Sequence, residues 1–536
     1  MPRRSAKHKI SLPYMLLYAC ITGLTVGAVL ALFITCSKVV VSAVFGFYKT
    51  CNTPLAVVCA LTLALLCCFL TAVVQTLCPM SKGSGIPLAE ASARGMLRVK
   101  WLSSAAALVA GSLLAFACGM PLGSEGPSIG VGGLIGDGIG RASKRPVEFR
   151  RYLITGGASA GLAVAFNAPL TGIAFALEET HRRFAPGILV AAATTVVSAV
   201  LASQAAFFGL GQIPYLDSIG IHAGFAALHF LTQVPTGTAQ YFIMCAVAAG
   251  AGLICAAAAV AFNRAIFALL KLFGKIKSAT LRLLPAFLLA SVCGVCLYLT
   301  VGSGEAMLAQ VFDNSALWLL FVLLAVRFVL TVTASGSKAT GGLFLPMMAI
   351  GGLIGMIVSR LCPYIGLDGS FAPNIIMICI SAFFAASAHA PISAIALSFE
   401  LTASFTNLLP CAIAVGAALV ISLVTRTEPL YEHMMEELYA AAPRPANGKN
   451  IVLRGIIGVD SAVREKRIRN VLWPYNSLVT ELVRGENRIV PDGETVLRVG
   501  DILTIHAENV DPEFFVSQAK EYITIADKCE NMPETD

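Results

Sequence analysis

Charge is scarce in this sequence, although the chain is long. Of its 536 residues, only 13% are Asp, Glu, Lys or Arg and 57% are hydrophobic. A soluble domain is typically about 25% charged and about 45–50% apolar. So few charged side chains cannot cover the several soluble domains that this length would otherwise suggest. The composition also excludes a disordered chain, because disordered segments are polar. The sequence therefore predicts an α-helical polytopic membrane protein.

The charge that is present is unevenly distributed. Residues 442–536 are about 28% charged, an ordinary value for a soluble domain, while residues 1–441 are only about 9% charged. We therefore predict a transmembrane domain over residues 1–441 and a small α+β cytosolic domain over residues 442–536. The net charge of +8 belongs to the loops of the membrane part, so it does not indicate nucleic-acid binding.

The 16 cysteines do not form a recognisable framework. Most lie inside apolar runs, where a free cysteine behaves as a small hydrophobic residue. Cys293 and Cys296 have the spacing of a redox or zinc motif, but they lie in an apolar segment with no second pair nearby. We predict neither a metal site nor a disulfide scaffold.

The beginning of the chain predicts the topology. Residues 1–9 are basic and lead into an apolar run from Leu12 that is too long for the hydrophobic region of a signal peptide. We interpret it as a retained membrane helix in contact with lipid. Basic flanks prefer the cytosolic side, so we expect both termini in the cytosol and a multi-pass protein of the cell (inner) membrane.

Two stretches of the chain occur twice. Residues 127–136 match residues 346–355 with an offset of 219, and residues 167–178 match residues 389–400 with an offset of 222. Two collinear matches with nearly equal offsets indicate a duplicated membrane unit. Duplication of this kind is typical of secondary transporters and of some channels.

Three glycine-rich turns precede apolar stretches. They are Gly83–Pro87, Gly123–Ser128 and Gly341–Pro346. Glycine permits unusual backbone angles and proline suits the first helical turn, so each turn predicts a helix N-terminus inside the membrane. Free N–H groups and the positive end of the helix dipole bind anions. Three converging N-termini would form an anion site; the alternative is that the turns only break helices and allow close packing.

Carboxylates in apolar surroundings are costly and are candidates for function. Glu125 lies inside the second turn, where its carboxylate can compete with an anion for the same N–H groups and protonation would release it. Glu178 and Glu179 end an apolar stretch; the alternative for this pair is a solvated helix end. We assign no role to Glu90 or Glu400.

One short motif suggests an enzyme, namely an intramembrane serine hydrolase, as an alternative function. Residues 157–161 read Gly-Ala-Ser-Ala-Gly, which fits the nucleophile turn of serine hydrolases, and His389 could act as the partner of Ser159. No strand is predicted before this motif, and small residues at this spacing usually serve helix packing in membranes. We therefore expect a protein that is not an enzyme.

Five motifs in order resemble the CLC family of chloride channels and chloride/proton antiporters. The resemblance covers most of the membrane part, and together with the duplication it is highly specific. The motifs are Gly83–Pro87, Glu125–Pro127, Asn167–Pro169, Gly342–Pro346 and Pro429–Tyr431.

The resemblance implies a homodimer in which each subunit has an anion pathway built from two inverted repeats, approximately residues 50–210 and 240–425. Ser84 and Tyr431 match the hydroxyl ligands of the central chloride, and the backbone N–H groups of Leu343 and Phe344 complete it. The glycines of the anion-site turns are Gly83, Gly85, Gly123, Gly126 and Gly342.

By the same resemblance, Glu125 is the gating glutamate that carries the proton and Glu179 is the inner proton-transfer glutamate. Family channels generally lack the second acid, so the pair favours H+/Cl− exchange over a passive chloride channel, which remains the alternative. Chloride is the implied transported ion, with no cofactor. Ser84 is retained where fluoride-selective relatives usually differ, whereas Ser124 replaces a common basic residue, which predicts weaker attraction of anions.

The tail alternates apolar and polar residues. We predict strands at residues 451–460, 489–490, 495–497 and 502–506, the last three in an antiparallel meander, and a helix at residues 464–471. Residues 489–503 resemble TrkA-C domains, which are regulatory modules of potassium transport systems. This resemblance implies a domain that dimerises and binds a small regulatory ligand such as cyclic di-AMP; the alternative is a dimerisation domain without a ligand. The tail has no tandem CBS domains, which points to a bacterial protein.

Overall fold

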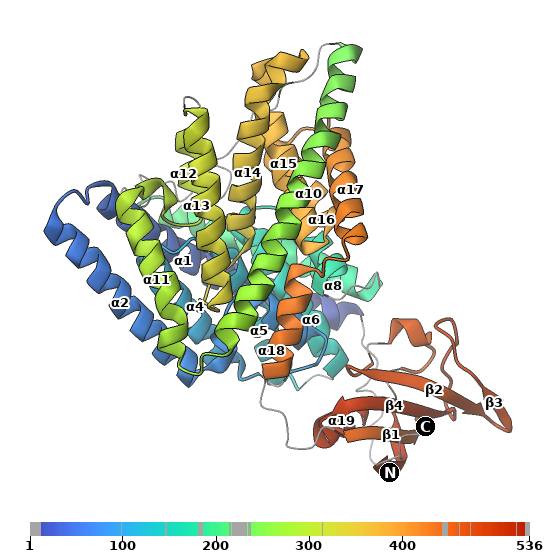
Figure 1. Ribbon diagram of the computed structural model, residues 1–536. Helices are drawn as coiled ribbons and strands as arrows, with labels where there is room; N and C mark the ends of the chain where they lie inside the picture. Colours follow the sequence, from blue (N-terminus) through green and yellow to red (C-terminus); the bar gives the residue numbers. More distant parts are fainter. Residues whose placement is uncertain are drawn as a thin grey trace.

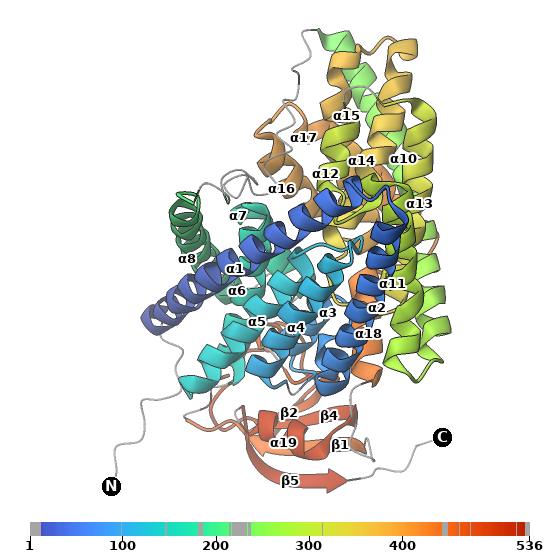
Figure 2. The ribbon, with the colours of Figure 1, turned by 90° about the vertical axis from the view of Figure 1, so that its left-hand side faces the viewer.

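The protein consists of a large helical body followed by a small β-sheet that lies against one end of it (Figures 1 and 2). The computed structural model describes residues 12–97, 99–144, 147–180, 186–213, 216, 233, 237–312, 315–441, 449–459, 461, 463–471, 473–520 and 522–530. The predicted basic N-terminus at residues 1–9 and the predicted domain boundary at residue 442 lie outside this range.

The helices of the body fall into two successive groups. The first group is α1 (Leu12–Lys49), α2 (Pro54–Leu77), α3 (Gly85–Ala93), α4 (Trp101–Ala117), α5 (Glu125–Ala142), α6 (Val147–Phe166), α7 (Pro169–Phe175) with a π-helical turn at Ala176–Thr180, and α8 (Pro186–Leu210). The second group is α10 (Thr238–Gly274), α11 (Ala279–Cys296), α12 (Glu305–Val311), α13 (Leu317–Gly336), α14 (Phe344–Leu361), α15 (Ala372–Ala388), α16 (Pro391–Thr402), α17 (Leu408–Val424) and α18 (Leu430–Ala441).

Most of these helices are suited to a lipid environment. Among the described residues, eight helical segments are long and apolar enough to cross a membrane. The outer helices α1 and α2 expose many leucine side chains, whereas α15 is buried along nearly all of its length. A helix that is apolar on every side and covered by protein forms the centre of a membrane bundle. These features confirm the predicted class of polytopic helical membrane protein.

The two groups of helices are related by an inverted repeat. The equivalent residues Gly123 and Gly342, 219 positions apart, form an antiparallel bridge in which each N–H donates to the other carbonyl, at 2.9 and 2.7 Å. From this point α5 and α14 run toward opposite ends of the body (Figure 2). Equivalent residues can bond to each other in this reciprocal way only near a local two-fold axis. The duplicated unit predicted from the sequence is therefore present as two inverted halves.

A second pair of equivalent residues repeats this reciprocity. The carboxylate of Glu178 accepts hydrogen bonds from the N–H groups of Ile392 and Ser393 and from the Ser393 hydroxyl, all at 2.8 Å. The carboxylate of Glu400 accepts the three equivalent bonds at the N-terminus of α7, at 2.6 to 2.8 Å. Each carboxylate thus caps the helix of the other half. The alternative of a solvated helix end is wrong for Glu178, and Glu400 has a structural role.

The tail forms a five-stranded antiparallel sheet. The strands are β1 (Lys449–Ile456), β2 (Ser477–Arg484), β3 (Asn487–Ile489), β4 (Ile502–Val510) and β5 (Thr524–Glu530), in the order β3-β2-β4-β1-β5. Helix α19 (Pro512–Ala519) connects β4 to β5, and its Phe515 joins the apolar core of the sheet. The predicted α+β class is confirmed, but β4 pairs with β1 and β2 and not with β3, so the predicted meander is wrong.

The predicted helix at residues 464–471 is also wrong. Only a single 3-10 turn forms there, at Ile468–Asn470. The segment instead pairs through its backbone with residues 493–497, including the bond from Glu465 N–H to the Leu497 carbonyl at 2.8 Å and the bond from Leu497 N–H to the Lys466 carbonyl at 2.9 Å. These non-local hydrogen bonds outweigh the local helical pattern, and they also explain why residues 495–497 are no strand of the sheet.

Candidate functional site

The three glycine-rich turns meet at the centre of the helical body. In addition to the bridge between Gly123 and Gly342, the Gly83 N–H donates to the Lys338 carbonyl at 3.1 Å, and the Gly341 N–H donates to the Gly83 carbonyl at 3.3 Å. These bonds bring together the N-termini of α3, α5 and α14. The convergence predicted from the sequence is therefore confirmed.

This meeting requires residues without a side chain. A Cβ atom on Gly126 would lie 2.5 Å from the Ser84 hydroxyl and 2.7 Å from the Cα atom of Gly342, and one on Gly85 would lie 2.3 Å from the Gly126 carbonyl. Such distances are well inside van der Waals contact. Glycine thus serves two purposes in these turns: it allows close approach of the three helices, and Gly83 adopts a left-handed conformation at φ 74°.

Two hydroxyl groups lie at the N-termini of short helices. Ser84 is the N-cap of α3, and its Oγ accepts a long hydrogen bond of 3.4 Å from the Ile86 N–H. Tyr431 is the second residue of α18 and is fully buried, and its Oη has no hydrogen-bond partner among the described residues. A buried hydroxyl without a partner is costly, so it suits a site that a ligand occupies.

The N-terminus of α14 supplies main-chain donors. Leu343 is the N-cap and Phe344 the first residue of this helix, and both are buried. The first N–H groups of an α-helix have no acceptor within the helix. The Phe344 ring packs against Phe166 and Phe384, with ring centroids 4.8 and 4.2 Å apart. These rings form an apolar wall beside the N–H groups at the start of α14.

Glu125 lies at the start of α5 and is buried. Its carboxylate folds back over the turns, because Cβ atoms on Gly123 and Gly342 would lie 2.2 and 2.6 Å from its Oε2. It faces the N–H groups of its own residue and of Leu345, but no donor in the described chain reaches hydrogen-bonding geometry with either oxygen. The carboxylate therefore occupies space at a helix N-terminus, where anions are favoured, without being locked there.

Tyr431 connects the candidate groups. Its hydroxyl lies within electrostatic range of the carboxyl groups of Glu179, Glu125 and Glu90. Glu179 is buried in the π-helical turn that follows α7, a type of irregular turn that is frequent at functional sites. The two predicted proton-carrying glutamates are therefore both buried in the part of the body around this tyrosine, as is Glu90.

Sequence reasoning assigned no functional role to two residues that lie next to this group. Glu90 is fully buried in α3, and the Arg94 guanidinium lies 4.0 Å from its carboxylate. Arg94 Nη2 also donates to the backbone carbonyl of Glu179 at 3.3 Å. The spacing of four residues between Glu90 and Arg94 is typical of ion pairs on one helix face, and that signal was available in the sequence.

The serine hydrolase motif has a structural purpose. Ser159 lies in the middle of α6, with no strand before it, whereas a nucleophile turn joins a strand to a helix. A Cβ atom on Gly157 would lie 2.1 Å from the Gly132 carbonyl of α5. The small residues of the motif therefore allow α5 and α6 to pack closely, and the hydrolase hypothesis is wrong.

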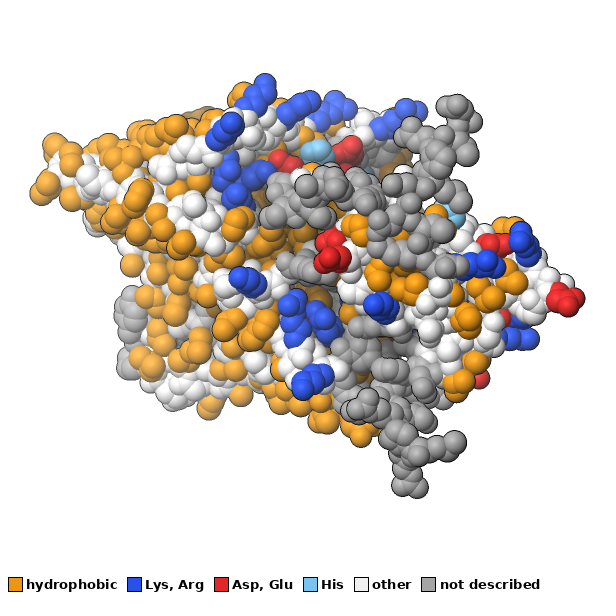
Figure 3. Space-filling view, turned by 90° about the horizontal axis from the view of Figure 1, so that it is seen from below, with side chains coloured by type: hydrophobic (Ala, Val, Ile, Leu, Met, Phe, Trp, Pro, Cys, Tyr) orange, Lys and Arg blue, Asp and Glu red, His pale blue; other side chains and the backbone are white. Residues whose placement is uncertain are grey.

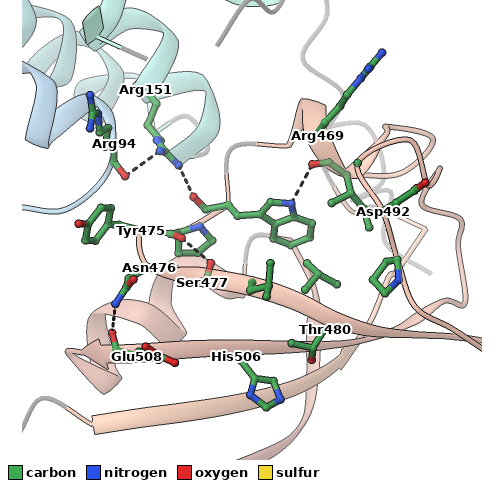
Figure 4. Close-up of a pocket in the computed structure, with 17 residues that line it drawn as sticks. Arg94, Arg151, Arg469, Tyr475, Asn476, Ser477, Thr480, Asp492, His506 and Glu508 are labelled. Carbon is green, nitrogen blue, oxygen red and sulfur yellow. Dashed lines mark hydrogen bonds between the residues drawn. The ribbon is translucent and has the colours of Figure 1, made fainter. Parts of the chain in front are cut away.

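A cavity lies between the helical body and the tail, away from the glycine-rich turns (Figure 4). It has a volume of about 760 Å³. Arg94 and Arg151 line it from the body, and Arg469, Trp473 and Tyr475 line it from the tail. Its walls therefore combine guanidinium groups with aromatic rings, and the acidic residues Asp492 and Glu508 also line it.

The helical part of the chain matches known proteins. A family model described as voltage gated chloride channel matches residues 66–423. The H(+)/Cl(-) exchange transporter ClcA of Yersinia pestis bv. Antiqua (strain Angola) is 31% identical over 402 residues, covering 72% of this chain and 78% of that protein. ClcA of Salmonella arizonae (strain ATCC BAA-731 / CDC346-86 / RSK2980) is 28% identical over 410 residues, covering 74% of this chain and 81% of that protein.

Solved structures of CLC proteins superpose on this chain. The crystal structure of a slow cyanobacterial Cl−/H+ antiporter superposes with a TM-score of 0.70 at 27% identity, covering 81% of this chain and 100% of the antiporter chain. A CLC-type fluoride/proton antiporter superposes with a TM-score of 0.61 at 20% identity, covering 78% of this chain and 97% of that chain, which is evidence for the fold alone. The family match ends at residue 423 and does not include the tail.

Proposed function

We propose that this chain, which belongs to the voltage-gated chloride channel (CLC) family, exchanges chloride for protons across a membrane. The observation that carries the proposal is that two glutamates from different elements, Glu125 at the start of α5 and Glu179 in the π-helical turn, are both buried in the helical body, where a carboxylate is costly. A passive channel needs one gate. A second buried acid, separate from the one at the anion-site turns, supports a route for protons alongside the anion.

The anion pathway passes through the meeting point of the helix N-termini. We assign the central chloride to the hydroxyls of Ser84 and Tyr431 and to the N–H groups of Leu343 and Phe344. The unpartnered Tyr431 Oη supports this assignment, as do the free N–H groups at the start of α14. The glycines of the three turns allow these donors to come close together.

Glu125 is the group that couples the two ions in this proposal. When ionised, its carboxylate occupies the N-terminus of α5 and competes with chloride. When protonated, it loses its attraction for the helix dipole, leaves the site and carries its proton away. Glu179 exchanges protons with the cytosolic side and relays them toward Glu125. Chloride and protons therefore move in opposite directions.

Reconstitution in liposomes tests this proposal. A chloride gradient should drive protons uphill in the wild type, and Glu179→Ala should abolish proton movement while chloride flux remains. Glu125→Ala should give chloride flux that no longer depends on protons. Proton movement that survives Glu179→Ala would refute the role of that residue, and chloride flux without protons in the wild type would favour the passive channel.

The membrane orientation and the assembly are part of the proposal. Figure 3 views the end of the molecule that bears the tail, where many lysine and arginine side chains gather. Basic residues prefer the cytosolic side, which supports cytosolic termini in the inner membrane of a bacterium. We also propose a homodimer, as the family resemblance implies. Mass measurement of the protein in detergent tests the dimer.

We further propose that the tail is a TrkA-C-like domain that regulates transport. The cavity between tail and body supports a ligand with negative charge and aromatic rings, such as cyclic di-AMP, because guanidinium groups and the rings of Trp473 and Tyr475 line it. Thermal unfolding of the full chain with cyclic di-AMP and with other nucleotides tests this proposal. The absence of any shift across the panel would favour a tail without a ligand.

A further inference from the structure

A smaller cavity also lies between the helical body and the tail. It has a volume of about 340 Å³, and we call it the α19 cavity, because α19 forms its tail side, below α4 and α5 (Figure 2). Arg151 of α6 lines both this cavity and the larger one of Figure 4. The Arg151 guanidinium donates to the carbonyls of Ala93 and Arg94 in the body, at 2.7 and 2.9 Å, and to the Trp473 carbonyl of the tail at 3.2 Å. Tail and body are thus joined at the edge of the cavity.

Most charged groups of the α19 cavity are guanidinium groups. Among its described lining residues the only acid is Asp137, and the bases are Arg141, Arg150 and Arg151. Asp137 is buried; its Oδ1 accepts a hydrogen bond from Arg150 Nη2 at 2.7 Å, and its Oδ2 lies 2.6 Å from Arg141 Nη2. One carboxylate therefore faces two guanidinium groups, which leaves an excess of positive charge at the cavity.

The protein holds Arg141 and Arg150 in place without a ligand. A Cβ atom on Gly140 would lie 2.5 Å from Cγ of Arg150, so the stem of Arg150 lies directly on α5. The side chains of Arg141 and Arg150 are still 41% and 25% exposed. A guanidinium group carries five N–H donors in a planar fork that fits a phosphate. In the described chain Asp137 engages only part of each fork, so donors remain for an anionic ligand.

The other walls of the α19 cavity are apolar and lie at the level of the membrane surface. Val99 lines the cavity just before α4, and Phe514 of α19 lines it from the tail. Trp101 begins α4 and packs against α5, because a Cβ atom on Gly138 would lie 2.6 Å from its ring. The next residue, Leu102, is 64% exposed at the start of this apolar helix. Tryptophan is enriched where a membrane meets water, so the cavity lies where lipid headgroups are found.

We propose that the α19 cavity binds the headgroup of an anionic phospholipid, with the phosphate on the guanidinium groups of Arg141 and Arg150. Basic pockets at the ends of membrane helices recognise such headgroups by charge. A free phosphate ion has the same charge but makes no use of the apolar walls, which suit the glycerol backbone and the first carbons of the acyl chains. Since α19 forms one wall, the lipid contacts tail and body together. The inference does not depend on proton exchange or on the anion site.

Native mass spectrometry of the full-length protein in detergent, with added dioleoylphosphatidylglycerol, tests the inference. Dioleoylphosphatidylcholine has the same acyl chains without net charge, and inorganic phosphate serves as a competitor. The first variant is Arg141→Gln, which removes one guanidinium group and leaves the buried Asp137 paired with Arg150. The second is Ser517→Trp, which fills the cavity from an exposed position on α19 and keeps every arginine. The control is Arg264→Gln, because Arg264 is an exposed arginine of α10 outside the cavity.

We expect dioleoylphosphatidylglycerol to bind the wild type at least about tenfold more tightly than dioleoylphosphatidylcholine, a difference of about 1.4 kcal/mol. Arg141→Gln and Ser517→Trp should each weaken its binding at least about fivefold, and the control should match the wild type. An excess of inorganic phosphate should not displace the lipid. Equal binding of the two lipids, or unchanged binding in either folded variant, would overturn the inference. Displacement of the lipid by phosphate would identify a site for free phosphate and would also overturn it.

Hydrogen exchange locates the bound lipid. In nanodiscs that contain dioleoylphosphatidylglycerol, the amides of α19 should exchange at least about threefold more slowly than in nanodiscs of dioleoylphosphatidylcholine alone, because the lipid covers α19 and holds it against the body. This difference should be lost in Arg141→Gln. Exchange of α19 that is the same in both nanodiscs would place the lipid elsewhere and contradict the inference.

Discussion

Two neighbouring glutamates differ completely in their surroundings. Glu178 accepts three hydrogen bonds at the N-terminus of α16. Glu179 is buried, its backbone carbonyl accepts a hydrogen bond from Arg94, and its carboxyl group lies within electrostatic range of Tyr431. Their adjacent positions in the sequence therefore do not show which of the two is the candidate proton carrier. The environment of each carboxylate separates the helix cap, Glu178, from the proposed proton carrier, Glu179.

This difference predicts opposite effects of two adjacent substitutions. Glu178→Ala removes a helix cap and leaves buried donors unpaired, so we expect a loss of about 1–3 kcal/mol of stability with proton coupling retained. Glu179→Gln should keep the thermal midpoint and lose coupling. Thermal unfolding and proton flux measured on the same preparations check both. Because the repeat is symmetric, Glu400→Ala should behave like Glu178→Ala; stability equal to the wild type in both would contradict the capping role.

At the scale of the elements, the proposed anion site depends on how closely the helix N-termini approach one another. We predict that Gly126→Ala lowers chloride affinity or transport at least about tenfold, because the added Cβ atom would overlap the Ser84 hydroxyl and the backbone of Gly342. Gly250→Ala in α10 is the matched control, since nothing lies within 4 Å of a Cβ atom there. Isotope uptake into liposomes measures both. An equal loss of chloride uptake in Gly126→Ala and Gly250→Ala would indicate a general effect of alanine on folding and would contradict the prediction.

The tail contains its own electrostatic element. Asp501 is buried, and it accepts hydrogen bonds from Arg484 Nε and Nη2 at 2.8 and 2.7 Å and from the Arg498 N–H at 2.7 Å. Burial alone would raise the pKa of Asp501, but the hydrogen bonds from Arg484 and Arg498 hold it below the usual value. The ionised form is therefore favoured in the folded tail. Its contribution to stability is present above the unfolded pKa of about 3.9 and is lost as the pH falls through the folded pKa.

We predict that Asp501→Asn destabilises the tail by about 1–3 kcal/mol at neutral pH, and that the difference from the wild type shrinks as the pH falls below about 4. Hydrogen exchange of the β2 and β4 amides in the full chain measures this. Glu486→Gln serves as the control, because Glu486 is exposed in the turn between β2 and β3. A destabilisation that does not change with pH would contradict the electrostatic origin.

At the scale of the whole molecule, patterns that depend on nearby residues were predictable. The apolar helices, the duplication and the three glycine turns follow from composition, spacing and internal similarity. The inverted relation of the halves was implied by resemblance, and the bridge between Gly123 and Gly342 shows it directly.

Features that depend on distant partners were not predictable. Glu178 and Glu400 cap helices more than 200 residues away, and residues 464–469 follow the backbone of residues 493–497 in place of their own helical pattern. The docking of the tail on α3 likewise depends on Arg151, which the sequence does not distinguish from other basic residues at helix ends.

The central claim is that chloride and protons move in an obligatory exchange. The most direct test is the reversal potential of the wild type in a planar bilayer with equal chloride on both sides and a pH gradient across it. Exchange predicts a reversal potential that departs from zero and follows the pH gradient. A reversal potential that stays at zero, with chloride current present, would contradict the account and identify a passive channel.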